Sequence, residues 1–151
     1  MITLKKTDAS NQDFISLVQQ LDADLAIRDG DDHMFYNQFN SISMIKYALV
    51  AYWDTIPVGC GAIKSFDNEA MEVKRMYVSP THRGKGIASI ILTELEQWAK
   101  ELGYTKCVLE TGINQPEALA LYNKNGFSRI PNYGQYADVP SSFCFEKNLD
   151  S

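Results

Sequence analysis

Apolar residues recur along this chain with two spacings, and the changes from one spacing to the other predict the order of its elements. Short apolar runs or alternation, typical of β-strands, occupy six segments: 2–7, 46–53, 58–66, 70–78, 106–110 and 142–148. Apolar residues three and four positions apart, typical of amphipathic helices, occupy 11–25, 87–102 and 116–126, and 33–39 is assigned as a short second helix. Counting a further strand between the last helix and 142–148, the predicted order is β-α-α-β-β-β-α-β-α-β-β, an α+β fold on a mixed sheet.

Capping and turn residues help to predict where these elements begin and end. Ser10 is a candidate N-cap for the first helix, and Asp13 falls in its first turn, where an acidic residue is favourable. Gly103 is expected to stop the helix that begins at residue 87, and Pro116 to start the next one. Residues 67–69, Asp-Asn-Glu, have the composition of a hairpin turn.

The length and charge of the chain narrow the classes of protein to which it can belong. With 151 residues, 45% of them apolar and 22% charged, residues 1–151 are expected to form a single domain. The formal net charge of −5 and the scattered basic residues argue against nucleic-acid binding. No apolar run approaches the roughly 18 residues of a membrane-spanning helix, and the first residues lack a signal-peptide core. We therefore expect a cytoplasmic protein that binds neither nucleic acid nor membrane.

The cysteines and histidines argue against two common kinds of site. Cys60, Cys107 and Cys144 all lie in apolar, strand-like runs, so we expect buried thiols, and their odd number argues against a disulfide framework. A catalytic thiol needs a nearby base, and the only histidines are His33 and His82. The same shortage of histidine, with no CxxC spacing, predicts no metal site.

A glycine-rich turn over residues 83–88, Arg-Gly-Lys-Gly-Ile-Ala, joins the predicted strand 70–78 to the helix 87–102. Such a turn gathers backbone N–H groups at the positive end of a helix, where they bind anions and above all phosphate. Neither the Walker pattern nor the dinucleotide fingerprint fits, because Gly86 follows the lysine and residue 89 is serine rather than glycine. On this turn alone, phosphate binding and a plain connection between strand and helix both stay open.

Two linked motifs resemble one family of enzymes. The pattern Arg83-x-x-Gly86-x-Ala88 resembles the Q/R-x-x-G-x-G/A signature of the GCN5-related N-acetyltransferases, the GNAT family, and residues 121–127, Leu-Tyr-Asn-Lys-Asn-Gly-Phe, are similar to its L-Y-x-K-x-G-F element. The resemblance implies a GNAT-like fold, in which helices cover both faces of a mixed, mostly antiparallel sheet of about seven strands. It also implies an acyltransferase that uses acetyl-CoA as donor and a primary amine as acceptor, without a metal.

The same resemblance implies which residues bind the coenzyme. Backbone N–H groups of the glycine-rich turn are expected to hold the CoA pyrophosphate, and the backbone of the preceding strand to pair with pantetheine. The side chains of Arg83 and Lys85 either touch phosphate or lie in solvent, and Asn114 either contacts the CoA arm or caps the next helix. The expected CoA-binding set is Met76, Tyr77, Val78, Arg83, Gly84, Lys85, Gly86, Ile87, Ala88, Asn114 and Tyr122.

Two residues are candidates for moving protons during the transfer. Tyr122 stands where the resemblance implies the acid that protonates the departing CoA thiolate; a tyrosine that only packs inside its helix is the alternative. Glu72 lies eleven residues before Arg83 (83 − 72 = 11), the position of the general base in histone-type members. Alternation would put Glu72 on the same strand face as Met76 and Val78. An exposed strand glutamate, with ordered water as the base, is the other interpretation.

The acceptor is the least determined part of the function, because the family varies there. Acidic residues near one rim favour a cationic amine, unless they only form a solvated loop: Asp22, Asp24, Asp29, Asp31 and Asp32. Tyr133, Tyr136 and Phe143 either wall the acceptor pocket or pack the sheet edge. We expect a small-molecule amine; a protein lysine or N-terminus, and a non-catalytic CoA-binding sensor or partner-binding module, are the alternatives. An exposed terminal strand would support a homodimer, although nothing in the sequence demands one.

Overall fold

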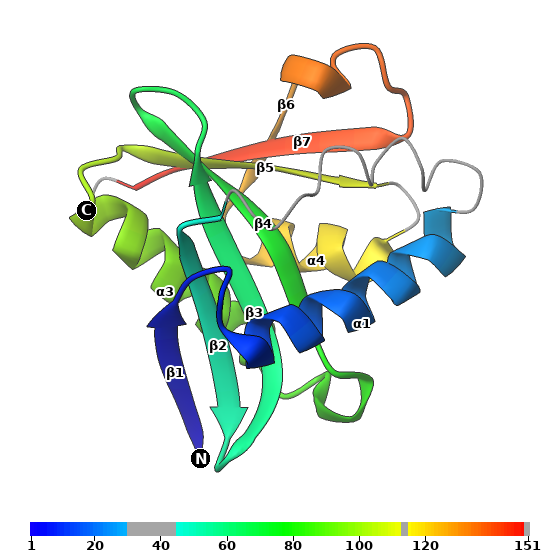
Figure 1. The fold of residues 1–151 in the computed structure, drawn as a ribbon. Coiled ribbons are helices and arrows are strands. Elements are labelled where there is room, and N and C mark those ends of the chain that lie inside the picture. The colour runs from blue at the N-terminus through cyan, green and yellow to red at the C-terminus, as the bar shows by residue number, and fades with distance from the viewer. Residues whose placement is uncertain (30–44, 113–114, 150–151) are drawn as a thin grey trace.

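The computed structural model contains both strands and helices, and it describes residues 1–29, 45–112 and 115–149 (Figure 1). The strands are β1 (Ile2–Thr7), β2 (Tyr47–Trp53), β3 (Ile56–Ser65), β4 (Ala70–Val78), β5 (Lys106–Gly112), β6 (Ser128–Ile130) and β7 (Ser142–Asn148). The helices are α1 (Gln12–Asp29), α3 (Ile87–Glu101) and α4 (Pro116–Lys124), with short 3-10 turns η3 (Pro80–His82) and η4 (Gly134–Tyr136). The short helix predicted at 33–39 lies outside the described residues.

All seven described strands belong to one sheet, in the order β1-β2-β3-β4-β5-β7-β6. Every neighbouring pair is antiparallel except β4 and β5, which run parallel. This confirms the prediction of a mixed, mostly antiparallel sheet. A parallel pair needs a crossover connection, and α3 supplies it between β4 and β5.

Helices cover both faces of the sheet, as predicted (Figure 1). On one face α1 buries Phe14, Leu17 and Val18 against small residues of β2 and β3. On the other face α3 buries a larger apolar stripe, and α4 adds Tyr122 to the same cluster. The helical spacing read from the sequence therefore corresponds to two separate cores, which we call the α1 face and the α3 face of the sheet.

Several predicted boundaries are confirmed, and others are wrong for local reasons. The strands at 2–7, 70–78 and 142–148 match the prediction to the residue. Ser10 is not the cap of α1: the helix begins at Gln12, and the side-chain oxygen of Asn11 accepts a hydrogen bond from the Phe14 N–H at 3.0 Å. Ser10 instead donates from its backbone and hydroxyl to the Asp8 carboxylate, which closes the turn before the helix.

A β-bulge interrupts β4 and changes which residues share a face. The register with β3 shifts between Cys60 and Ala62, and Arg75 takes a left-handed conformation with φ of 62°. Before the bulge, Glu72 and Lys74 lie on the α1 face, since Lys74 is opposite Ala62 in the α1-face cluster. After it, Met76 and Val78 pack in the α3-face cluster. The expectation that Glu72 shares a face with Met76 and Val78 is therefore wrong, because the extra residue breaks the alternation.

Candidate active site

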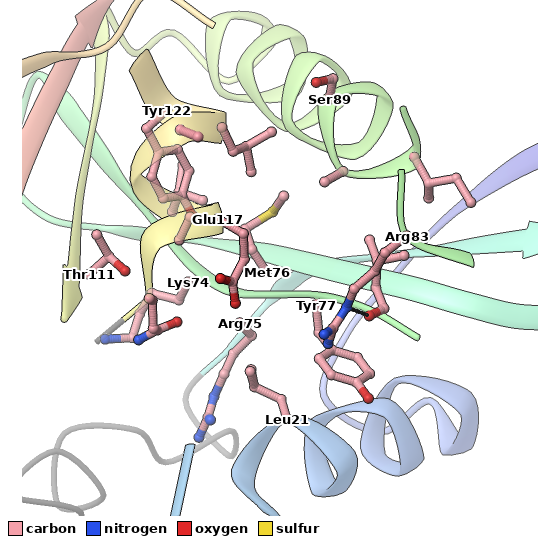
Figure 2. A pocket seen from close by; sticks show the side chains of 18 of the residues that line it. Leu21, Lys74, Arg75, Met76, Tyr77, Arg83, Ser89, Thr111, Glu117 and Tyr122 are labelled. Atoms are coloured by element: carbon pink, nitrogen blue, oxygen red, sulfur yellow. Dashed lines mark hydrogen bonds between the residues drawn. The ribbon is translucent and has the colours of Figure 1, made fainter. Parts of the chain in front are cut away.

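Strands β4 and β5 part from each other halfway along the sheet, and we call this opening the fork. They pair only over Ala70–Glu72 and Lys106–Val108, although β4 continues to Val78 and β5 to Gly112. Figure 1 shows the two strands running in different directions from that point. A cavity of about 410 Å³ occupies the fork, lined by β4, the glycine-rich turn, α4 and one side of α1 (Figure 2).

The edge of β4 that faces the fork presents backbone hydrogen-bonding groups. Tyr77 is paired with Cys60 of β3, and the N–H of Ser79 donates to the Val58 carbonyl at 2.8 Å. Backbone groups alternate in direction along a strand, so those of Met76 and Val78 point away from β3 and into the fork. The Nε of Arg83 donates to the Val78 carbonyl at 2.8 Å, which agrees with this direction. The strand edge at the fork is thus available to an extended amide chain.

The glycine-rich turn has the geometry of an anion site. Gly84 and Gly86 have φ of 79° and 81°, and Gly86 is the left-handed N-cap of α3. A Cβ added at either position would meet no atom within 4 Å, so conformation rather than space requires glycine there. Within the described residues, no backbone carbonyl accepts a hydrogen bond from the N–H of Gly84, Lys85 or Gly86. The turn therefore directs donors outward at the positive end of a helix.

The two cations of the turn point in different directions. The Arg83 guanidinium stacks 5.6 Å from the Tyr77 ring while its Nε holds the end of β4, so this side chain braces the turn against the strand. The Lys85 ammonium lies 5.6 Å from the ring of Trp53, and Lys85 is not among the residues that line the cavity. Of the predicted CoA-binding residues, Met76, Tyr77, Val78, Arg83, Gly84, Gly86, Ile87, Ala88 and Tyr122 line the cavity; Asn114 lies outside the described residues.

Tyr122 on α4 forms part of the cavity wall and is 6% exposed. Its ring packs edge-on against Phe127 at a centroid distance of 5.7 Å, which holds it in place. Burial raises the pKa of the Tyr122 phenol well above its usual range, and the charge of Glu110 raises it further. Tyr122 therefore keeps its proton at neutral pH, as a proton donor must.

Glu72 also lines the cavity, but it lies on the α1 face and is held by neighbours. The Tyr133 hydroxyl donates to its Oε2 at 2.7 Å, and the Lys74 ammonium lies 3.8 Å from its Oε1. Burial, followed by the charge of Glu72, raises the pKa of Tyr133, so the phenol stays protonated and keeps donating. The interpretation of Glu72 as an exposed strand residue is wrong, since Glu72 is 8% exposed.

The predicted acceptor residues separate into several groups. Asp22 is bound to the Arg75 guanidinium at 2.7 Å, so it does not form part of a free acidic rim. Asp24 and Tyr136 line the cavity, whereas Phe143 packs in the α3-face cluster under Arg129. Asp31 and Asp32 lie outside the described residues, as does the side chain of Asp29.

Sequence reasoning missed several residues that line the cavity. Among the missed polar residues are Lys74, Arg75, Glu110, Thr111 and Glu117 (Figure 2 labels all but Glu110). These residues share one signal. Each is a charged or hydroxyl side chain that lies within an otherwise apolar strand or in the first turn of a helix. Lys74 and Arg75 in particular interrupt the buried run of β4, and a pair of cations in that position indicates a hollow beside the strand.

The remaining predictions concern sites that the chain was expected to lack. Cys60, Cys107 and Cys144 are buried free thiols, as predicted, and burial raises the pKa of Cys60 to about 12 despite the charge of Arg75. Within the described ranges, no set of three or more potential ligand side chains is arranged to hold a metal ion. Among the helices that the structure describes, none has the length and apolar character to cross a membrane.

Known proteins resemble this chain over nearly its whole length. The model of the acetyltransferase (GNAT) family matches residues 15–127. An IAA acetyltransferase from Azospirillum brasilense is 35% identical, over 98% of both chains. A solved Klebsiella pneumoniae protein named for acyl-CoA N-acyltransferase activity is 31% identical over 99% of both chains, with a TM-score of 0.83. The PaiA N-acetyltransferase of Thermoplasma acidophilum, solved with coenzyme A, shares the fold: its TM-score is 0.73 at 21% identity, over 98% of this chain and 99% of its own.

Proposed function

Because the chain belongs to the acetyltransferase (GNAT) family, we propose that it transfers the acetyl group of acetyl-CoA to a primary amine of a small molecule. The fork between β4 and β5 is the observation that carries this proposal. It offers an extended strand edge, a glycine-rich turn at one end and a buried, protonated phenol in one cavity. These three features suit the binding and cleavage of a CoA thioester.

The described residues suit acetyl-CoA at both of its ends. At one end, the N–H groups of the turn between Gly84 and Ala88 would hold the pyrophosphate, aided by the positive end of α3. At the other, the outward backbone groups of Met76 and Val78 would pair with the amides of pantetheine, as a strand pairs with its neighbour. Arg83 contributes by fixing the turn on the strand, and Lys85 through its backbone N–H.

The reaction forms a bond between the acceptor nitrogen and the acetyl carbon and breaks the bond from that carbon to the CoA sulfur. A backbone N–H of Met76 or Val78 would stabilise the negative charge that develops on the carbonyl oxygen. Glu72 would take the proton that the attacking amine gives up. Tyr122, a protonated phenol in the cavity wall, would give its proton to the departing thiolate.

Calorimetry followed by an amine screen tests the proposal. CoA and acetyl-CoA should bind the protein, and acetyl-CoA should release one equivalent of free thiol for each amine acetylated, measured over a panel of small amines. Tyr122→Phe is the matched control, because it should bind CoA and release little thiol. Coenzyme binding without turnover would favour a sensor, and turnover only with peptides that carry lysine or a free N-terminus would favour a protein acceptor. A protein that binds no coenzyme would refute the proposal altogether.

A further inference from the structure

We propose that the acceptor carries a carboxylate beside its amine, so that Lys74 receives the carboxylate while Glu72 faces the amine. The inference rests on the proposed function and specifies its substrate class: amino acids and close derivatives rather than polyamines or simple amines. It starts from the position of one ammonium group in the fork.

Lys74 is a cation in the wall of the cavity, where it forms a long ion pair with Glu72. Its side chain is 10% exposed, and it lines the fork on the α1 face. Its nearest carboxylate oxygen, Oε1 of Glu72, lies 3.8 Å from the ammonium, and no side chain or carbonyl within the described ranges accepts a hydrogen bond from it. Burial disfavours the charged ammonium, and hydrogen bonds from its N–H donors to a bound anion would compensate for it. An anionic group in the cavity would satisfy those donors.

The groups around Lys74 leave this position to a ligand. Tyr133 occupies the other oxygen of Glu72 at 2.7 Å, and Asp22 is committed to Arg75 at 2.7 Å. Burial lowers the pKa of Lys74; Glu72 and Glu110 act to raise it, and the neighbouring cations Lys64 and Arg75 to lower it. Glu72 is thus shared between Tyr133 and Lys74, and Asp22 is engaged by Arg75.

The spacing of charges matches a zwitterion. The ammonium of Lys74 and the carboxylate of Glu72 lie 3.8 Å apart on one strand face. By standard bond lengths, the amine and carboxylate of an α- or β-amino acid are also about 3–4 Å apart. Such a compound places each of its charges against the opposite charge of the protein. A polyamine would instead bring a second ammonium against Lys74 and Arg75, where like charges repel.

Matched triplets of acceptors test the inference. Each triplet consists of an amino acid, its carboxamide and its decarboxylated amine, on several carbon skeletons that include glycine, β-alanine and aromatic amino acids. kcat/KM is measured for the wild type, for Lys74→Met and for Lys64→Met. The last variant removes the same charge from an exposed residue that lies outside the cavity lining. For each compound, the wild-type kcat/KM is divided by the variant kcat/KM. The effect of that compound's amine basicity on kcat/KM cancels in this ratio.

For at least one skeleton, the carboxylate member should be the best wild-type acceptor. Lys74→Met should lower its kcat/KM by about 10- to 100-fold, the range for a hydrogen bond to a charged group. The decarboxylated amine should change by less than about threefold, and Lys64→Met should preserve the wild-type preference. Calorimetric binding of the favoured amino acid to the enzyme–CoA complex should weaken in parallel. Lys74→Gln replaces the methionine variant if thermal unfolding reveals a folding defect.

Three other outcomes would overturn the inference. If the uncharged members are preferred on every skeleton, or if Lys74→Met slows all three members equally, Lys74 is only a structural partner of Glu72. If the wild type binds CoA but acetylates no member of any triplet, the inference is refuted. Turnover with other amines of the wider panel would then leave the proposed function standing, and no turnover with any amine would refute it too, so the two failures are distinguishable.

Discussion

Replacing Gly86 by alanine should weaken coenzyme binding through backbone conformation alone. Gly86 has φ of 81°, and a Cβ built there meets nothing within 4 Å. No clash therefore contributes, and the cost is that of holding alanine in a left-handed conformation, roughly 1–2 kcal/mol. At 1.4 kcal/mol per factor of ten, this corresponds to about a 5- to 30-fold loss of CoA affinity if the free turn relaxes and CoA binding must restore it.

If the turn keeps its shape in the apo protein, the free-energy cost of the left-handed alanine lowers the stability of the fold instead of the CoA affinity. In that case the apo protein loses thermal stability and the affinity stays unchanged, so both quantities must be measured. Calorimetry with CoA and thermal unfolding of the apo protein provide them, and their summed loss should lie near 1–2 kcal/mol. Asparagine tolerates the left-handed region, so Gly86→Asn is the matched control and should recover most of the loss. An asparagine variant as impaired as the alanine variant, or an alanine variant with no loss in either measurement, would refute this account of the turn.

Three further substitutions test other parts of the site. Tyr122→Phe should lower kcat by about 10²- to 10⁴-fold with little change in the calorimetric CoA affinity; an unchanged kcat would remove Tyr122 from the acid role. Glu72→Gln should shift or abolish the acidic limb of the pH–rate profile, because the amide cannot take a proton, and an unmoved limb would leave water as the base. Asp22→Asn should destabilise the fold by about 3 kcal/mol in chemical denaturation, because it leaves the 4% exposed Arg75 guanidinium without its carboxylate; a loss below about 1 kcal/mol would mean that water or another group compensates.

The sequence alone predicted the fold well where local signals agree with one another. The pattern of β4 is strand-like on both faces, Pro116 is found in the first turn of α4, and Gly103, with φ of 94°, lies beyond the last turn of α3. Prediction failed where two candidates competed within a few residues. Asn11 rather than Ser10 caps α1, because the side chain of Asp8 already engages Ser10.

The backbone features of the candidate site could be predicted from the sequence, whereas the contacts of its side chains could not. The glycine-rich turn and the edge of β4 depend on main-chain geometry, and the sequence motif indicates that geometry. The partners of Glu72 did not follow from the sequence, because Tyr133 is 61 residues away and reaches it only through the fold. The environment of Lys74 likewise could not be predicted, because it depends on the point at which β4 and β5 diverge. No local sequence pattern indicates such a divergence.

The bulge at Arg75 explains how one strand presents two different surfaces to the fork. Without the extra residue, alternation would bring Glu72 and Lys74 to the same face as Met76, inside the apolar cluster under α3, where burying two charges is unfavourable. The bulge keeps the charges on the α1 face and turns Met76 toward α3, opposite Gly61, where even a methyl group would come within 2.7 Å of the Met76 sulfur. The left-handed conformation of Arg75 costs about 1–2 kcal/mol, and its ion pair with Asp22 offsets part of that cost. The strained residue thus separates the charged α1 side of the fork, to which we assign the acceptor, from the backbone edge that we assign to the coenzyme.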